Sequence, residues 1–307
     1  EFDVRLPLAS LFQAPTVETL ARTIQRGSTA QLAWPLVAIQ PHGSRLPFFC
    51  VHGIGGAVFG YAALARHLGE DQPFYGLTAE HDSTDEVESI EAMAARYIRA
   101  IAAVQSDGPY LLGGYSYGGT VAFEMARQLR RDGHDVGVLA MFDHPAPQSG
   151  YEVARLNGTF VRGFARNLLP WTRDFLSLSS REQLGRLRRK LLTPRPARVD
   201  EVDIGQWMDD VSRVPEGSRQ LVRRHLQAVL MYAPRPYDGH VTLFRTSRRP
   251  LLCSYDPHLG WGRLALGGVR VRDVPGAHRN LLQAPHVHAV ARSLRAVLDE
   301  VGRRRRA

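Results

Sequence analysis

The stretch GGYSYGGTVAFEMA, residues 113–126, places one serine between two tyrosines and two pairs of glycines. It follows a short apolar run and leads into a helix-like pattern. Gly114–Gly118 therefore fits the pattern G-x-S-x-G in the strand–turn–helix setting that presents a nucleophile. The glycines allow a strained backbone to close against a sheet, and a helix N-terminus favours negative charge. These features predict a nucleophilic Ser116, where a flexible turn is the alternative interpretation.

The order of elements around this motif predicts the fold. Apolar runs alternate with helical patterns through residues 36–144, which is typical of a mainly parallel sheet with helices on both faces. Residues 150–234 then read as helices only, at 158–169, 181–192 and 217–232, before two more strands and a closing helix at 286–301. We predict an α/β-hydrolase fold with a helical lid over about 150–234, although a packing appendage is the alternative for that insertion.

A serine nucleophile needs a base, which in this fold class comes last in the chain, after the acid. His278 follows a strand and lies in the Pro-Gly loop before the last helix. We predict it as the base ahead of four other histidines: His286 and His288 fall at a helix start, His258 lies in a loop with no preceding strand, and His52 comes too early.

The acid and the oxyanion donors follow from strand ends. Asp143 comes directly after the apolar strand VGVLAMF, so we favour it over Asp256 as the carboxylate that orients His278. The backbone N–H of Tyr117, which follows the nucleophile, is one expected oxyanion donor. The N–H of Ile54, in the glycine-rich sequence HGIGG, is the other, with an ordinary glycine turn as the alternative.

Composition limits the remaining function classes. The chain has 307 residues and a formal net charge of +9, but its aromatic residues are not interleaved with its arginines, so we do not expect nucleic-acid binding. It has no apolar run long enough to span a membrane and no signal-peptide pattern, so we expect no membrane partner. With two cysteines, Cys50 and Cys253, a cytoplasmic protein is the simplest interpretation. No metal site is predicted.

The N-terminal residues differ from the rest of the chain. Thr16 is positioned to cap a short helix whose Val17, Leu20 and Ile24 share one face, with nothing of its own to pack against. A small, polar linker follows. We therefore divide the chain into the end of a preceding domain at 1–27, a linker at 28–35 and a main domain at 36–307.

These motifs together resemble a known family. GYSYGG, FDHPAP and VPGAHRNLL, with the helical insertion between the last two, are similar to type I thioesterase domains of non-ribosomal peptide synthetases and polyketide synthases. LPLASLFQAPTVETLA resembles the C-terminal end of a peptidyl or acyl carrier domain. Two positions depart from the family pattern: Ala277 stands where an acidic residue is expected, and Arg279 stands where an aromatic residue is common.

The resemblance implies a terminal thioesterase that releases an assembly-line product through an acyl-Ser116 intermediate, by hydrolysis or macrocyclisation. His278 would be the base and Asp143 its orienting acid, with Tyr117 and Ile54 as oxyanion donors and Arg279 as a substrate contact. The thioester substrate would be carried on the phosphopantetheine arm of an upstream carrier domain in the same polypeptide, and the thioesterase domain itself would bind no cofactor.

Two other functions remain open from the sequence. One is a free-standing type II proofreading thioesterase or esterase, and the other is a non-catalytic docking module. A further hypothesis is that lid arginines pair with acidic groups of the carrier or with the phosphate of its arm, against the alternative that they are solvated. These arginines are Arg155, Arg162, Arg166, Arg173, Arg181, Arg186, Arg188 and Arg189.

Overall fold

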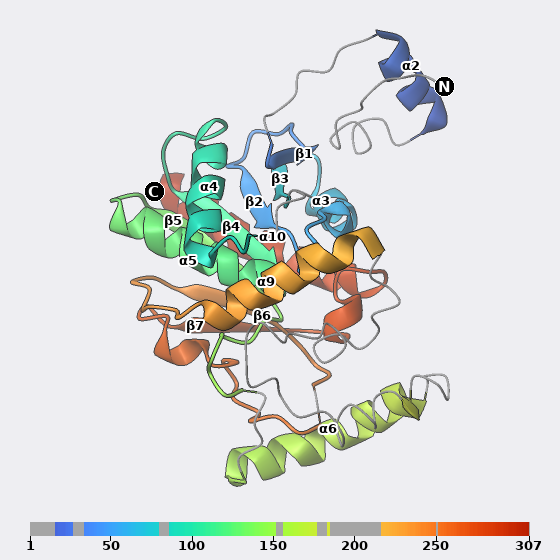
Figure 1. Ribbon diagram of the computed structural model, residues 1–307, viewed down its shortest axis with the longest axis vertical. Coiled ribbons are helices and arrows are strands. Elements are labelled where there is room, and N and C mark those ends of the chain that lie inside the picture. The colour runs from blue at the N-terminus through green and yellow to red at the C-terminus, as the bar shows by residue number, and fades with distance from the viewer. Residues whose placement is uncertain are drawn as a thin grey trace.

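A seven-stranded sheet forms the centre of the molecule (Figure 1). The computed structural model describes residues 16–26, 34–79, 86–151, 156–176, 183–184, 216–249 and 251–306. In chain order the strands are β1 (Leu36–Gln40), β2 (Phe48–Val51), β3 (Phe74–Leu77), β4 (Tyr110–Tyr115), β5 (Val136–Phe142), β6 (Val241–Thr246) and β7 (Val269–Val274). Their spatial order is β1-β3-β2-β4-β5-β6-β7. All neighbours are parallel except the edge pair β1 and β3, which is antiparallel.

Helices cover both faces of this sheet. The main ones are α3 (Ala62–Leu68), α4 (Ile90–Ala102), α5 (Tyr117–Arg131) and α10 (His286–Arg306). α4 packs on α5 at one face, and α3 packs on α10 at the other. The predicted α/β fold with a mainly parallel sheet is therefore confirmed, with one antiparallel edge strand.

Strand β2 shows how the sheet separates two hydrophobic cores. Phe49 and Val51 face the core beneath α4 and α5, whereas Phe48 and Cys50 face the core beneath α3 and α10. Side chains alternate in this way because successive residues of a strand point to opposite faces. All four are buried, which explains why β2 reads in the sequence as a continuous apolar run.

The turn between β4 and α5 requires two of its glycines. A Cβ on Gly114 would lie 2.1 Å from the carbonyl oxygen of Gly118. A Cβ on Gly118 would lie 2.3 Å from the carbonyl oxygen of Val51 and 2.4 Å from that of His52. These neighbours are backbone atoms that cannot swing aside. The turn therefore closes on itself only with glycine at 114, and the start of α5 packs against the end of β2 only with glycine at 118. α5 begins at Tyr117, directly after Ser116.

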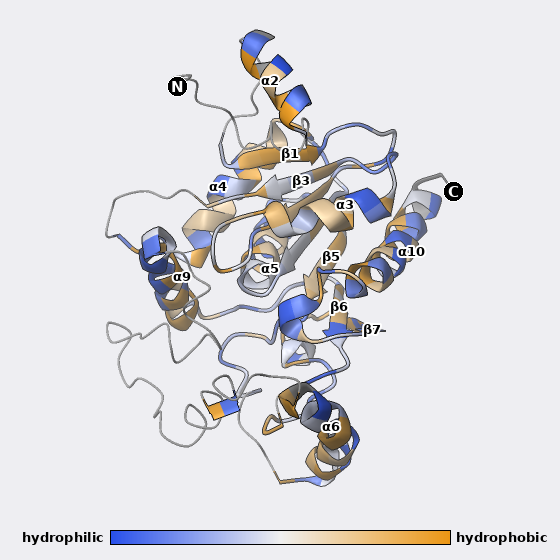
Figure 2. Cartoon of the chain, turned by 90° about the vertical axis from the view of Figure 1, so that its right-hand side faces the viewer, coloured by the Kyte–Doolittle hydropathy of each residue, from blue (hydrophilic) through white to orange (hydrophobic). Residues whose placement is uncertain are grey.

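The insertion between β5 and β6 contains two long helices within the described residues. α6 (Gly158–Leu176) continues past Pro170, beyond the expected end at residue 169, and α9 (Arg219–Met231) corresponds to the pattern at 217–232. Figure 2 shows hydrophobic residues along α6. Val161, Leu168 and Leu169 of this helix are exposed. The helix expected at 181–192 lies outside the described residues except for 183–184.

Buried polar contacts hold this insertion to the main body. The buried Asn167 of α6 donates to the carbonyl oxygen of Arg249 at 2.8 Å and accepts from the Arg249 N–H at 3.1 Å. On α9 the closing residue Tyr232 donates its hydroxyl proton to the Glu124 carboxylate of α5 at 2.8 Å. Among the lid arginines, Arg162, Arg166 and Arg173 are exposed on α6, and the other five lie outside the described residues. The lid boundaries stay a prediction.

The N-terminal helix α2 (Val17–Arg26) lies apart from the sheet in Figure 1. Thr16 caps it as expected, since its hydroxyl oxygen accepts a hydrogen bond from the Thr19 N–H at 3.2 Å. Val17 is 88% exposed, so the apolar face predicted for this helix is not covered there. Residues 1–15 and most of the expected linker are outside the described part of the chain, and the division into domains stays a prediction.

Within the described residues, no helix combines the length and apolar character needed to cross a membrane. Cys50 and Cys253 are both buried free thiols, and burial raises the pKa of the Cys50 thiol well above its ordinary value.

We expect Gly118→Ala to destabilise the protein, because the added methyl group would overlap the carbonyl oxygens of Val51 and His52. The loss should be about 1–3 kcal/mol or more in the free energy of unfolding, as for other overpacked sites. Urea denaturation followed by circular dichroism measures it. Gly60→Ala is the matched control, since a Cβ there meets no atom within 4 Å. Equal stability of the two variants would contradict the packing argument.

Candidate active site

Ser116 lies at the tip of the turn between β4 and α5. Its backbone adopts φ 55° and ψ −125°, a left-handed conformation that non-glycine residues rarely adopt. The residue stands at the N-cap of α5, yet its side chain makes no capping hydrogen bond. Its Oγ instead lies 3.1 Å from Nε2 of His278. The strained turn thus directs the hydroxyl away from the helix and toward the imidazole.

Asp143 follows the last residue of β5 and also has a positive φ, at 53°. Nδ1 of His278 lies 3.2 Å from the Asp143 carboxylate oxygen Oδ2 and 2.9 Å from the Asp143 carbonyl oxygen. Both are acceptors, so Nδ1 carries the hydrogen and Nε2 is left to accept a proton from Ser116 Oγ. The structure therefore brings together the serine, histidine and aspartate that the sequence selected.

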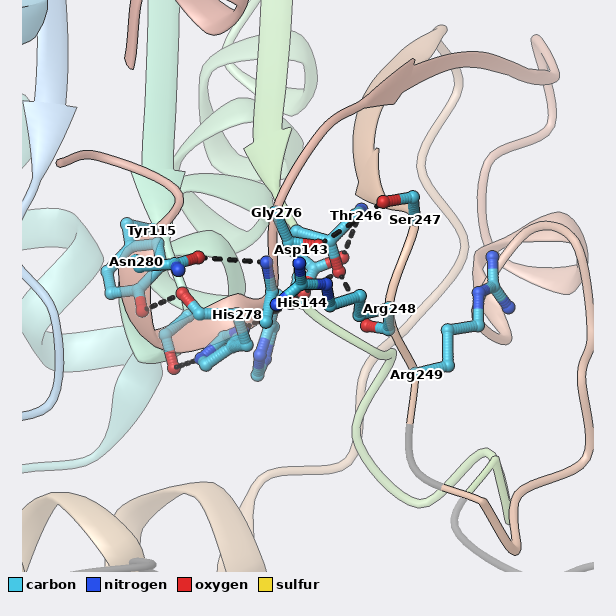
Figure 3. Close-up of polar contacts among 12 residues, drawn as sticks. Tyr115, Asp143, His144, Thr246, Ser247, Arg248, Arg249, Gly276, His278 and Asn280 are labelled. Carbon is cyan, nitrogen blue, oxygen red and sulfur yellow. Dashed lines mark hydrogen bonds and ion pairs between the residues drawn. The ribbon is translucent and has the colours of Figure 1, made fainter. Parts of the chain in front are cut away.

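Thr246, the last residue of β6, holds the Asp143 carboxylate (Figure 3). Its N–H donates to Oδ1 at 2.7 Å, and its hydroxyl donates to Oδ2 at 2.9 Å. Burial alone would raise the pKa of the Asp143 carboxyl, but the hydrogen bond and charge of His278 and the bonds from Thr246 hold that pKa below its ordinary value. Asp143 is thereby kept as a carboxylate facing the imidazole.

Tyr115 and Asn280 fix the segment that carries His278. The ring of Tyr115 stacks on the imidazole with centroids 4.9 Å apart, and its hydroxyl donates to the His278 carbonyl oxygen at 2.6 Å. Asn280 closes the 3-10 turn His278–Asn280 by accepting the Ala277 N–H at 2.9 Å, as Figure 3 shows. The His278 side chain is 46% exposed, so its imidazole is held from one side and open on the other.

Two predicted oxyanion donors lie beside this site. Tyr117 provides the first N–H of α5, which has no partner inside the helix because the first turn leaves its donors free. Ile54 lies in the loop after β2, which packs against the start of α5 at Gly118. No hydrogen bond from the Ile54 N–H is made within the described part of the chain. The roles of both groups stay predictions.

The alternative candidates have structural roles. The Asp256 carboxylate accepts from the N–H groups of His258 and Gly260, so it caps a local turn and does not face His278. His52 is fully buried, and His286 begins α10.

Arg279 follows His278 in the same 3-10 turn and is exposed; its proposed contact with substrate stays a prediction. Within the described residues, no cluster of three or more histidine, cysteine or acidic side chains is arranged to hold a metal ion.

Several residues that contact the predicted site residues, or the turns that carry them, were not predicted from the sequence. Thr246 could have been found, because β6 is a parallel strand and a hydroxyl at its carboxyl end meets the end of a neighbouring strand. Tyr115 lies inside the G-x-S-x-G stretch, but the pattern says nothing of its ring. Nothing in the sequence indicated Asn280, whose hydrogen bond to Ala277 is local to the 3-10 turn. Nor did it indicate His225, whose Nδ1 lies 2.7 Å from the carbonyl oxygen of Ile54, 171 positions away in the chain.

Three further histidines lie near the site; His52 and His225 are buried, and His144 is half-buried. Burial lowers the pKa of His52 to about 3, with a further contribution from the neighbouring His225, whose own pKa burial lowers to about 4. Burial and the charge of His278 lower the pKa of His144 to about 3. His144 Nε2 lies 2.7 Å from the Thr120 hydroxyl. These rings are therefore neutral near pH 7 and act as hydrogen-bonding groups.

Two cavities flank this region. One of about 310 Å³ is lined by Met93, Arg96 and His225, among others, and one of about 720 Å³ is lined by residues that include Tyr151 and Asp256. Neither is lined by Ser116, Asp143 or His278, so neither is assigned to the acyl group.

Comparisons with known proteins agree on one family. The model of the thioesterase domain family matches residues 46–298. Malpinin synthetase from Mortierella alpina is 33% identical over 288 residues, which is 89% of this chain but 3% of the synthetase. The structure of holo-AB3403, a four-domain non-ribosomal peptide synthetase, is 25% identical with a TM-score of 0.62 over 95% of this chain and 22% of its own. The Vlm2 thioesterase domain bound to a dodecadepsipeptide is 26% identical with a TM-score of 0.52, over 85% of this chain and 96% of its own.

We expect the free energy of unfolding to fall as the pH is lowered from 6.5 toward 4. Well above pH 6.5 these three histidines are neutral in both states. As the pH falls through 6.5 the unfolded chain binds protons that the folded chain excludes, because the folded pKa values are about 3 to 4. Each group contributes at most about 1.4 kcal/mol per pH unit.

Urea denaturation across this pH range measures the slope. His144→Gln keeps an amide near the position of Nε2 but cannot titrate, so its slope should be shallower than that of the parent. His42→Gln, at an exposed histidine, is the matched control for the substitution itself. A His144→Gln slope equal to that of the parent would contradict the assignment.

Proposed function

The chain belongs to the thioesterase domain family, and we propose that it releases a carrier-bound peptidyl or acyl product of a non-ribosomal peptide or polyketide assembly line. The observation that carries this proposal is the hydrogen-bonded series from Ser116 Oγ through the His278 imidazole to the Asp143 carboxylate. It supplies an activated nucleophile, a base and an orienting acid in the geometry that acyl transfer needs.

In the first step, Ser116 Oγ attacks the thioester carbonyl carbon as its proton passes to Nε2 of His278. The Asp143 carboxylate stabilises the resulting imidazolium through Nδ1–H. The tetrahedral oxyanion accepts hydrogen bonds from the N–H groups of Tyr117 and Ile54. When the intermediate collapses, the C–S bond breaks, His278 returns its proton to the thiolate, and the acyl group remains on Ser116 as an ester.

In the second step, a nucleophile opens the ester. Water, or a hydroxyl or amine of the bound chain itself, loses its proton to His278 and attacks the ester carbonyl. Ser116 Oγ then leaves and recovers a proton from the imidazolium. Water gives a free acid by hydrolysis, whereas an internal hydroxyl or amine gives a lactone or a lactam by macrocyclisation.

The substrate in this proposal arrives on the phosphopantetheine arm of an upstream carrier domain in the same polypeptide. Similarity to a four-domain non-ribosomal peptide synthetase over 95% of this chain supports that arrangement. The capped helix α2, which ends before the linker, supports the assignment of residues 1–27 to the end of a carrier domain. The thioesterase domain needs no cofactor of its own for the steps above, and a cytoplasmic location remains part of the proposal.

The test uses a panel of peptidyl and acyl N-acetylcysteamine thioesters with the parent protein and Ser116→Ala. We expect an acyl adduct on Ser116 in the parent and a loss of turnover of about 10³-fold or more in the variant, because the nucleophile acts together with its base. Mass spectrometry follows adduct and product, and the product mass separates hydrolysis from macrocyclisation. Ser106→Ala, at an exposed serine after α4, is the matched control.

The same panel separates the alternatives. A non-catalytic docking module would give neither adduct nor turnover with any thioester, and Ser116→Ala would match the parent. A proofreading thioesterase or esterase would form the adduct but prefer short, unrelated acyl groups and oxygen esters over peptidyl thioesters. Either result would reject assembly-line product release.

We expect Arg279→Ala to change the preference among acyl chains in this panel, because the exposed guanidinium follows the base by one residue. Phosphonylation of Ser116 by a small reactive phosphonate should keep the parent rate, since that probe lacks the chain that Arg279 would contact. Relative kcat/KM values across the panel measure the effect. Arg235→Ala, an exposed arginine after α9, is the control. An unchanged order of preference would remove Arg279 from the site.

A further inference from the structure

Two buried histidines hold the loop that carries Ile54. We propose that His52 and His225 are positioning residues that aim the Ile54 N–H at the developing oxyanion, and that His225 makes the lid helix α9 part of this support. The inference deepens the proposed function and rests on it, because it assumes that Ile54 is an oxyanion donor. It concerns the groups that orient the donor, which the reaction scheme alone leaves unspecified.

His52 acts on the peptide group that contains the donor. Its Nδ1 lies 2.6 Å from the carbonyl oxygen of Gly53, which also accepts the Gly56 N–H at 2.9 Å. The Gly53 carbonyl and the Ile54 N–H belong to one planar trans peptide, so fixing the direction of the C=O fixes the N–H on the opposite side. His52 Nε2 lies 2.8 Å from the Tyr97 hydroxyl, whose other neighbour is the Thr78 carbonyl oxygen at 3.2 Å. With Nδ1 donating to Gly53, Nε2 accepts, so the Tyr97 proton points to the shorter contact.

His225 acts on the next peptide group and comes from a distant part of the chain. It lies on α9, and its Nδ1 is 2.7 Å from the carbonyl oxygen of Ile54. A carbonyl oxygen accepts only, so Nδ1 of His225 carries the hydrogen. The peptide groups on both sides of the Ile54 Cα are therefore each anchored by an imidazole N–H, which removes the rotations that would turn the donor away.

The two imidazoles also contact the other predicted donor residue. The ring of His225 stacks on Tyr117 with centroids 4.5 Å apart and on His52 with centroids 5.1 Å apart. His52 in turn lies against Tyr117 at 5.6 Å. All three rings are at most 3% exposed, so the cluster has little room to move. One cluster thus touches the residues that provide both expected oxyanion donors.

A second residue of α9 supports the same loop. A Cβ on Gly56 would lie 2.8 Å from Cδ2 of Leu221, so this helix already occupies the space beside the loop. α9 itself is attached to α5, the helix that begins after the nucleophile, through Tyr232 and Glu124. The position of α9 therefore helps to set the position of the Ile54 N–H.

The test compares His225→Leu with His225→Asn. Leucine removes the donor but keeps an apolar side chain, whereas the asparagine amide nitrogen is bonded to Cγ as Nδ1 is and can donate to the Ile54 carbonyl. Stopped-flow measurement gives the rate of acylation of Ser116 by one thioester of the panel. The dissociation constant of the same thioester is measured for each change in the Ser116→Ala background, where no reaction consumes it.

We expect His225→Leu to slow acylation by about ten- to a hundredfold, less than the ~10²–10³-fold loss on deleting a donor outright. Its dissociation constant should stay within about twofold of the parent, because the donor acts on the transition state and not on the bound substrate. His225→Asn should keep most of the parent rate. Leu226→Ala, at the next buried residue of α9, controls for lost packing and should acylate near the parent rate.

Three results would overturn the inference: acylation by His225→Leu at the parent rate, equal loss in His225→Leu and His225→Asn, or equal loss in Leu226→Ala. If His225→Leu does not fold, His225→Gln replaces it. The glutamine amide is one bond further from the backbone than the asparagine amide and cannot reach the position of Nδ1. Equal acylation rates for His225→Asn and His225→Gln would then overturn the inference. The proposed function fails by a different result. If the single variant Ser116→Ala still turns over the thioester, the proposed function is rejected, whatever the rates of the His225 variants.

Discussion

Backbone hydrogen bonds continue across the carboxyl edge of the sheet after its strands have ended, and the candidate site depends on them. The Ser116 N–H donates to the Phe142 carbonyl oxygen at 3.3 Å, and the Asp143 N–H donates to the Phe244 carbonyl oxygen at 2.8 Å. On the far side, the Arg248 N–H donates to the Gly276 carbonyl oxygen at 3.2 Å. Each bond joins one strand end to the next, so segments far apart in the sequence reach the same edge in fixed register.

This ladder explains why two residues of the site adopt left-handed backbone conformations. Ser116 and Asp143 both leave a strand while their N–H groups remain bonded to the neighbouring strand, and both must turn sharply to present their side chains above the edge. Such conformations persist only where surrounding contacts fix them. For Ser116 the contacts are the glycine-lined packing of α5 on β2, and for Asp143 they are the two hydrogen bonds from Thr246. The strain therefore lies at the two positions whose side chains must be aimed most accurately.

The sequence predicted those parts of the molecule that local patterns determine. The strands and main helices follow from apolar periodicity, and Ser116, Asp143 and His278 follow from motif, strand position and chain order, so their selection needed no knowledge of contacts. Asp143 was preferred over Asp256 on strand position, and the structure places its carboxylate 3.2 Å from the imidazole. The antiparallel direction of β1 could not be predicted from the sequence, because it depends on how β1 pairs with β3 at the edge of the sheet. His225 was beyond reach for a related reason: it lies 171 residues from Ile54 in the sequence and meets it only through the packing of α9.

The buried histidines indicate how polar groups can surround a reacting centre without competing for its proton. A buried imidazole costs little when both nitrogens find partners, and it stays neutral because charging it without water is unfavourable. His52 bridges Tyr97 and Gly53 in this way, and His144 bonds Thr120 directly behind the acid. His278 differs in that it is 46% exposed and faces a carboxylate, which favours the charged ring that forms when it takes a proton from Ser116. Burial thus separates chemically identical side chains: in the proposed reaction the buried His52 and His225 orient the loop of Ile54, and the more exposed His278 carries the proton.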